Sequence, residues 1–228
     1  MTPSSMIPPS AAIPFWSPEE IEASLGPTIA HLRGGGLLAY PTETVYGFGG
    51  APEREPVEAL VRLKRRPPGK PFLLLIAGSG MIDRLGLHLP PAAARLAARH
   101  WPGPLTLVLP GGERRVPERL RGPEGGVAVR WTSHPGLQRL ILAYGDPITS
   151  TSANRPRRPP AASAAEILAD WPAEIATGLL RVIDGGTLAP SEPSTVVDCT
   201  GRRLRVIRPG AVAAATLRES APDLVGDL

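Results

Sequence analysis

Residues 37–50 read Leu37-Leu38-Ala39-Tyr40-Pro41-Thr42-Glu43-Thr44-Val45-Tyr46-Gly47-Phe48-Gly49-Gly50, and this stretch sets the pattern of the fold. Its first four residues are apolar and predict a short buried strand. The other ten form a polar loop in which glycine allows a ligand to approach the backbone closely. Taken alone, the loop is equally compatible with an ordinary turn. The same order of apolar strand and polar loop recurs along the chain, which favours a ligand site beyond the strand ends of an α/β sheet.

Helices and strands alternate irregularly on both sides of this stretch. The first helix begins with a capping box, in which Ser17 caps, Pro18 takes the first helical position and Glu20 closes the box. Further helices are predicted at 55–63, 91–100, 134–143, 163–169 and 213–219, and further strands at 71–76, 105–109, 127–130, 148–149, 180–183, 195–198 and 204–207. This alternation predicts an α/β fold with a mixed, twisted sheet and flanking helices.

Length and composition indicate one domain without a membrane span. The chain has 228 residues, of which 42% are hydrophobic and 20% charged, as in ordinary globular proteins. No run of about 18 apolar residues is present.

Residues 1–16 are expected to form a disordered or loose lead-in, 17–215 the domain and 216–228 a tail. The single cysteine, Cys199, fits the reducing cytoplasm and is interpreted as a buried core residue.

Two lysines stand out because every other long basic side chain is arginine. They are Lys64 and Lys70, both within 63–71. A lysine ammonium is a compact point charge that arginine does not reproduce, so this segment is a candidate phosphate site. The alternative is chance survival on a solvated helix end. The lysine segment is the second polar loop, and the only asparagine, Asn154, lies in a third at 149–154.

Charge and motifs narrow the class of ligand. The net charge is +4, and basic residues cluster at 62–70, 155–158 and 202–208, which suits a nucleotide triphosphate or RNA. Aromatic residues make up only 4%, which weakens binding modes built on base stacking. The P-loop and dinucleotide motifs are absent, and the four histidines lack metal-ligand spacing. A fourth polar loop at 193–198 is followed by Arg208, and convergence of all four loops on one cleft is the simplest interpretation.

Together these motifs resemble the YrdC family. The resemblance is carried by the loop at 41–47, Lys64-x-Arg66-Pro67 with Lys70-Pro71, Ser152-Ala153-Asn154, and 193–198 with 208–210. It covers residues 17–215 and implies a twisted mixed sheet around a large, basic, open cavity. The family includes L-threonylcarbamoyladenylate synthases, which join L-threonine, bicarbonate and ATP into threonylcarbamoyl-AMP and release pyrophosphate. That product serves the modification of adenosine 37 in tRNA, so downstream tRNA threonylcarbamoyl-transfer machinery is an implied partner.

The resemblance also implies roles for single residues. Lys64 and Arg66 would be catalytic through the triphosphate, and Mg²⁺ is expected to accompany it. The implied ATP contacts are Lys64, Arg66, Ser152, Asn154 and Arg208, and the implied threonine contacts are Thr42, Lys70, Arg130, Ser150 and Ser194. The metal ligands are not indicated by the sequence.

The sequence departs from the family pattern in two ways. Phe48 and Phe72 stand where leucine is expected, and Asn154 is followed by Arg155-Pro156 in place of a small Ser-Gly pair. The second departure makes that loop stiffer and more basic. Two alternatives to the synthase stay open at this point: a YrdC-like paralogue that binds tRNA or double-stranded RNA without synthase activity, and a carbamoyl-transfer module for a different acceptor.

Overall fold

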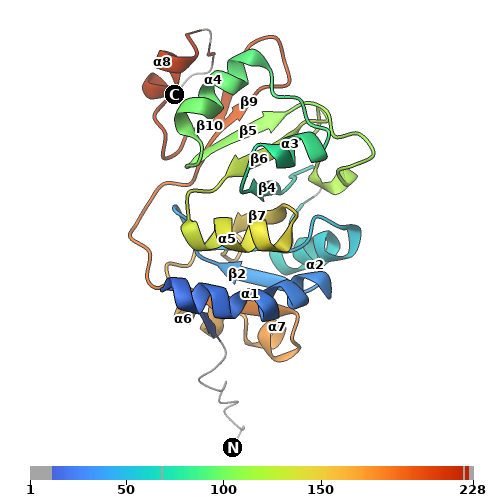
Figure 1. Ribbon diagram of the computed structural model, residues 1–228, viewed down its shortest axis with the longest axis vertical. Helices are drawn as coiled ribbons and strands as arrows, with labels where there is room; N and C mark the ends of the chain where they lie inside the picture. Colours follow the sequence, from blue (N-terminus) through green and yellow to red (C-terminus); the bar gives the residue numbers. More distant parts are fainter. Residues whose placement is uncertain (1–11, 68, 223, 226–228) are drawn as a thin grey trace, which may run out of the picture.

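The computed structural model describes residues 12–67, 69–222 and 224–225. Within these residues one ten-stranded mixed sheet runs through the molecule, in the order β1-β8-β2-β3-β7-β4-β6-β5-β9-β10 (Figure 1). The strands are β1 (Ala12–Pro14), β2 (Leu37–Tyr40), β3 (Gly47–Gly49), β4 (Leu73–Ile76), β5 (Leu105–Leu109), β6 (Val127–Trp131), β7 (Ile148–Ser152), β8 (Leu180–Asp184), β9 (Thr195–Asp198) and β10 (Arg205–Arg208). The predicted α/β fold with a mixed sheet is confirmed.

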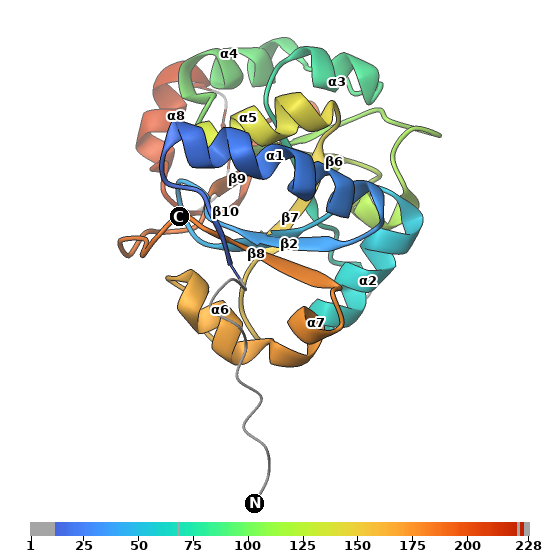
Figure 2. The ribbon, with the colours of Figure 1, turned by 60° about the horizontal axis from the view of Figure 1, so that its bottom comes forward.

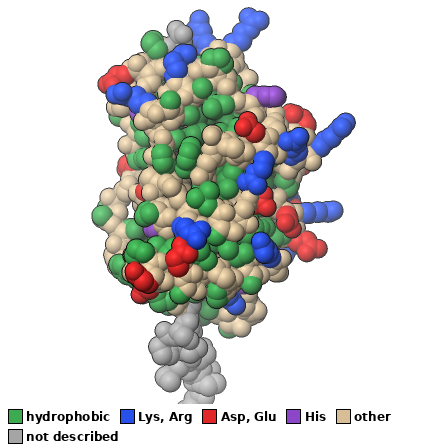
Figure 3. Space-filling view, viewed as in Figure 1, with side chains coloured by type: hydrophobic (Ala, Val, Ile, Leu, Met, Phe, Trp, Pro, Cys, Tyr) green, Lys and Arg blue, Asp and Glu red, His purple; other side chains and the backbone are tan. Residues whose placement is uncertain are grey.

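Helices cover the sheet on both faces. They are α1 (Pro18–Arg33), α2 (Arg54–Lys64), α3 (Gly80–Arg84), α4 (Pro91–His100), α5 (Pro135–Tyr144), α6 (Ala164–Asp170), α7 (Pro172–Ala176) and α8 (Ala214–Ser220), with a 3-10 turn at Glu118–Leu120. Figure 2 shows α1 and α5 on one side of β2 and β8, with α6 and α7 on the other. Charged side chains stand mostly toward the rim of the face that carries α3, α4 and α5, around apolar surface (Figure 3).

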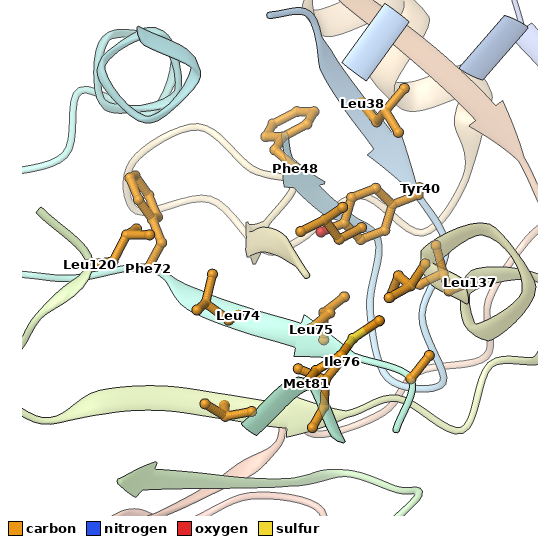
Figure 4. Close-up of a cluster of buried hydrophobic side chains, with 14 of the residues drawn as sticks. Leu38, Tyr40, Phe48, Phe72, Leu74, Leu75, Ile76, Met81, Leu120 and Leu137 are labelled. Atoms are coloured by element: carbon orange, nitrogen blue, oxygen red, sulfur yellow. The ribbon is translucent and has the colours of Figure 1, made fainter. Parts of the chain in front are cut away.

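The stretch at 37–50 forms two adjacent inner strands of this sheet, β2 and β3. All four residues of β2 are buried, as predicted, and Tyr40 donates its hydroxyl hydrogen to the carbonyl oxygen of Thr149 at 2.8 Å. Figure 4 shows Tyr40 beside Leu38 and Phe48 in the apolar core. The following loop contains a strand that the sequence did not predict, β3, which pairs with β2 and β7. A Cβ on Gly49 would lie 1.7 Å from the Thr149 carbonyl oxygen, so only glycine fits at position 49.

The predicted helices and strands are otherwise present, with differences at their ends. The capping box forms, since the Ser17 Oγ accepts from the Glu20 amide and the Glu20 carboxylate accepts from the Ser17 amide. Strand β7 continues to Ser152, three residues further than predicted. The short helices α3 and α7 were not predicted because five residues carry too little periodicity.

The chain ends pack more closely than the predicted lead-in and tail. Residues 1–11 lie outside the described part, but β1 pairs in parallel with β8, and Phe15 is 3% exposed. The missing side chain of Gly136 makes room for that ring. At the other end, Leu217 on α8 is fully buried and α8 packs against α4. The expectation of loose packing is therefore wrong for residues 12–16, and residues 216–220 belong to the domain.

Candidate functional site

A cleft of about 460 Å³ lies on the face of the sheet that α3, α4 and α5 leave free. Because side chains alternate along a strand, Leu107 and Val129 enter the core while their neighbours Thr106 and Arg130 line the cleft. Eight of the ten predicted site residues line it: Thr42, Arg66, Arg130, Ser150, Ser152, Asn154, Ser194 and Arg208. The described lining holds three arginines and no aspartate or glutamate. The four polar loops therefore converge, as the sequence analysis expected.

Arg130 forms a buried cation at the floor of this cleft. Its guanidinium donates to the Thr44 Oγ1 at 3.3 Å and to Glu43 at 3.4 Å, and Glu43 also accepts from Thr132 at 2.7 Å. Burial lowers the pKa of Arg130, while Glu43 acts in the opposite direction. Its Nε has no partner within the described residues. A guanidinium with unused donors at a cleft floor can receive a carboxylate from a ligand.

Arg208 is held over the cleft by Ser194. The guanidinium donates to the Ser194 carbonyl oxygen at 2.7 Å and to its Oγ at 3.0 Å, and that Oγ also meets the Thr106 hydroxyl at 2.8 Å. Ser194 is 1% exposed, so its hydroxyl is largely engaged in fixing Arg208. The predicted contact of Ser194 with threonine stays a prediction.

Arg66 is fixed by the backbone of the lysine segment. Its Nε donates to the Lys70 carbonyl oxygen at 2.7 Å, one Nη donates to the Pro71 carbonyl oxygen at 2.6 Å, and the guanidinium lies 4.6 Å from the centre of the Phe72 ring. The other Nη reaches Thr151 at 3.3 Å. These contacts aim the positive charge of Arg66 into the cleft while the side chain stays in one position.

Lys70 lies outside the cleft. Lys70 lines a neighbouring depression of about 290 Å³, and its carbonyl oxygen supports the site by accepting a hydrogen bond from Arg66. The contact of its side chain with threonine stays a prediction. Thr42 does line the cleft, but its hydroxyl donates to the Val45 carbonyl oxygen at 2.7 Å and accepts from two backbone amides. It shapes the loop at 41–47.

Lys64 has a different position from the one that the sequence predicted. Its ammonium does not line the cleft: it donates to the Ser152 carbonyl oxygen at 2.7 Å, to the Asn154 carbonyl oxygen at 2.5 Å and to the Asn154 Oδ1 at 2.7 Å. Three donors are all that an ammonium has. Burial, with a smaller contribution from Arg66, lowers its pKa to about 8. Contact with a triphosphate would require one of these bonds to be exchanged for a phosphate oxygen.

The Ser152–Asn154 turn is therefore organised from beneath by Lys64. The Ser152 hydroxyl donates to the Asn154 Oδ1 at 2.6 Å, and the side-chain Nδ2 of Asn154 donates to the Arg158 carbonyl oxygen at 2.7 Å. Both side chains still line the cleft. The turn presents a fixed edge to a ligand.

The three cleft arginines repel one another. After burial, the charge of Arg208 is the next cause that lowers the pKa of Arg66, and the charge of Arg130 acts likewise on Arg208. Like charges held together in a concave site are relieved by an anion, so the cleft suits a ligand with several negative charges.

The donor set does not fit a metal held by the protein. The described lining offers no carboxylate, and no group of three or more His, Cys, Asp or Glu side chains in the described ranges is placed to hold an ion. Mg²⁺ stays a prediction, as a companion of the triphosphate. Among the same residues, no helix combines the length and apolar character needed to cross a membrane.

Sequence reasoning missed several residues of the site. Glu43 and Thr44 stand in the loop at 41–50, but their pairing with Arg130 depends on β6 lying near that loop. Thr106 and Thr151 lie inside strands, and the alternation of side chains was the only signal that could have exposed them.

The fold and the cleft define a class: an α/β protein with a cationic cleft on one face of a mixed sheet, suited to a multiply charged anion. The chain belongs to the Sua5/YciO/YrdC family, whose model, described as "Telomere recombination", matches residues 30–210. The predicted resemblance to the YrdC family is thereby confirmed.

Individual relatives are similar over most of the chain. A protein of Chromohalobacter salexigens named threonylcarbamoyl-AMP synthase is 39% identical over 192 residues, which are 82% of this chain and 99% of the relative. One of the same name from Marinobacter nauticus is 38% identical over 173 residues, 75% of this chain and 89% of the relative. A crystal structure of P. abyssi Sua5 complexed with L-threonine is 31% identical with a TM-score of 0.82; the match covers 94% of this chain and 62% of that one. This chain thus spans less than two thirds of the P. abyssi protein.

Proposed function

We propose that this protein is a threonylcarbamoyl-AMP synthase, which makes threonylcarbamoyl-AMP and pyrophosphate from L-threonine, bicarbonate and ATP. The observation that carries the proposal is the ring of three arginines in one cleft whose described lining contains no acid. Such a site binds a triphosphate and a carboxylate together. Family membership and the names of relatives that match along nearly their whole length support the same activity.

The chemistry requires two steps. The free amine of threonine forms a bond to the carbon of bicarbonate, and water leaves, which produces a carbamate. A carbamate oxygen then attacks the α-phosphorus of ATP, and the bond from that phosphorus to the bridging oxygen breaks. Pyrophosphate leaves with the electron pair. No covalent intermediate on the protein is needed, so the work of the protein is positioning and electrostatic stabilisation.

The cleft residues divide naturally between the two substrates. Arg66 and Arg208 carry fixed charges toward the open side and would neutralise the phosphates, whose negative charge grows on the leaving pyrophosphate. Arg130, at the buried floor of the cleft, would pair with the threonine carboxylate. Ser152 and Asn154 would contact the nucleotide, and Ser150 the threonine. Lys64 would support catalysis through the turn that it holds.

The biological setting follows from the product. Threonylcarbamoyl-AMP is an activated mixed anhydride that a second enzyme must consume, so tRNA threonylcarbamoyl-transfer machinery in the cytoplasm is the proposed partner. The basic segment at 155–158 supports a separate proposal, that this protein binds tRNA or double-stranded RNA.

The test is incubation of the purified protein with ATP, L-threonine and bicarbonate. We expect pyrophosphate release that depends on threonine and on bicarbonate, with threonylcarbamoyl-AMP identified by mass spectrometry. Omission of either substrate is the control. Release of pyrophosphate without threonine would point to another acceptor, and salt-sensitive tRNA binding with no release would favour an RNA-binding paralogue.

A further inference from the structure

Two cations and two aromatic rings form a row behind the Ser152–Asn154 turn. The ammonium of Lys64 lies 5.9 Å from the centre of the Phe48 ring, and Phe48 meets Trp171 edge to face, with ring centres 4.7 Å apart at 79°. The guanidinium of Arg155 lies 5.2 Å from the centre of the Trp171 ring. These four residues come from α2, β3, the α6–α7 junction and the loop after β7, so they join distant parts of the chain.

Both ends of the row are attached to the turn. Lys64 donates three hydrogen bonds to Ser152 and Asn154, and Arg155 is the residue directly after Asn154. Arg155 also donates to the carbonyl oxygen of Asp170, the residue before Trp171. The turn is therefore held from beneath by one cation and at its exit by the other.

Trp171 is suited to be a fixed anchor. It is 2% exposed and lies where α6 ends and α7 begins, and its backbone amide donates to the Ile167 carbonyl oxygen at 3.0 Å. Arg155 itself is exposed, so its contacts with Trp171 and Asp170 are what restrain it. Phe48 and Arg155 are two of the positions at which the sequence departs from the expected pattern, and both contact this one indole.

We propose that Arg155, anchored on Trp171, is a positioning residue for the nucleotide. It touches no substrate; it holds the exit of the Ser152–Asn154 turn so that the turn is ordered before ATP binds. Without the anchor, ordering this loop would be part of the cost of binding, and the affinity for ATP would fall. The inference rests on the proposed function for the identity of the nucleotide.

The alternative is that Arg155 acts only as a positive charge near the rim of the cleft. Arg157 is a matched control, because it lies in the same exposed segment and its side chain makes no hydrogen bond or ion pair within the described part of the chain. Loss of either arginine removes one charge, but only Arg155→Gln removes a cation from an aromatic face. Arg155→Lys keeps a cation there.

The experiment measures the Kd for ATP by calorimetry on the full chain, together with the KM values for ATP and L-threonine. We expect Arg155→Gln to weaken ATP binding about two- to fivefold, the range of an exposed cation–π contact, with kcat and the KM for threonine unchanged. Arg157→Gln should leave the Kd unchanged, and Arg155→Lys should recover most of the loss. In a Trp171→Phe background, whose smaller ring keeps the site folded, Arg155→Gln should have a smaller effect.

Three results would overturn the inference: an unchanged Kd in Arg155→Gln, an equal loss in Arg157→Gln, or a wild-type protein that binds no ATP. The proposed function fails separately. If ATP binds but no threonylcarbamoyl-AMP forms, the synthase assignment is wrong, while the ratio of Kd values still decides the role of Arg155.

Discussion

Replacing Lys64 with methionine separates the two roles that have been assigned to this lysine. The sequence predicts a contact with the triphosphate, whereas the structure shows an ammonium that binds three oxygens of the Ser152–Asn154 turn. Methionine keeps an apolar stem of similar length and removes all three donors. Because the turn loses these donors, Lys64→Met should destabilise the folded protein even in the absence of ATP.

The magnitude follows from what each oxygen loses. The Asn154 carbonyl oxygen has no other donor within the described residues, and the loss of its partly buried hydrogen bond to a charged donor costs about 1.5–3 kcal/mol. The Ser152 carbonyl oxygen still accepts from the Asn154 backbone amide at 3.1 Å, and the Asn154 Oδ1 still accepts from the Ser152 hydroxyl at 2.6 Å. The loss of the lysine bond to each of these two oxygens therefore costs roughly 0.5–1.5 kcal/mol. Relief of the desolvation that lowers the Lys64 pKa offsets part of this sum. We expect the free energy of unfolding to fall by about 2–4 kcal/mol.

The assay is urea unfolding followed by circular dichroism, with the Kd for ATP measured on the same samples. Lys70→Met is the matched control, because it removes the other lysine from an exposed position and should change stability by less than about 0.5 kcal/mol. Lys64→Arg should fall between the wild type and Lys64→Met, since a planar fork cannot point three donors as an ammonium does. If Lys64→Met unfolds like the wild type but loses ATP binding, the direct phosphate contact is correct and the structural role is wrong.

Three further predictions concern the cleft and the sheet. Arg130→Gln should raise the KM for threonine about 10- to 100-fold, the value of a charge-assisted pair, with a smaller effect on the Kd for ATP; equal effects on both would contradict the division of the cleft. Gly49→Ala, whose Cβ would lie 1.7 Å from the Thr149 carbonyl oxygen, should lower stability by about 3 kcal/mol in thermal unfolding. Gly26→Ala, which meets nothing within 4 Å in helix α1, should leave stability unchanged or higher. Burial lowers the pKa of Lys64 from 10.5 to about 8, so between pH 8 and pH 10.5 the unfolded chain binds more protons than the folded protein. The contribution of Lys64 to the free energy of unfolding therefore rises with pH across this window. Lys64→Met should lack this rise.

Local order was predictable wherever a pattern repeats over enough residues. The capping box placed the start of α1, the apolar run placed β2, and alanine-rich periodicity placed α4 at 91–100. The strand β3 was hidden because two of its three residues are glycine, which carries no pattern, and it forms only because β2 and β7 stand on either side of it. The packing of the chain ends was likewise not predictable from local sequence, because Phe15 and Leu217 are buried by elements far away in the sequence.

For the site, residue types and motif order were enough to find the ligand class and most of the lining. Arginine, hydroxyl and amide groups after apolar strands mark an anion site wherever those strands end together, and eight of ten predicted residues do line one cleft. The direction in which each side chain points is a different matter. The ammonium of Lys64 turns to the carbonyl oxygens of Ser152 and Asn154, and the side chain of Lys70 lies outside the cleft. The direction of the Lys64 side chain depends on packing between segments about ninety residues apart in the sequence. A buried ammonium is stable only where oxygen atoms accept its hydrogen bonds. Linear sequence does not encode such a contact in any local pattern.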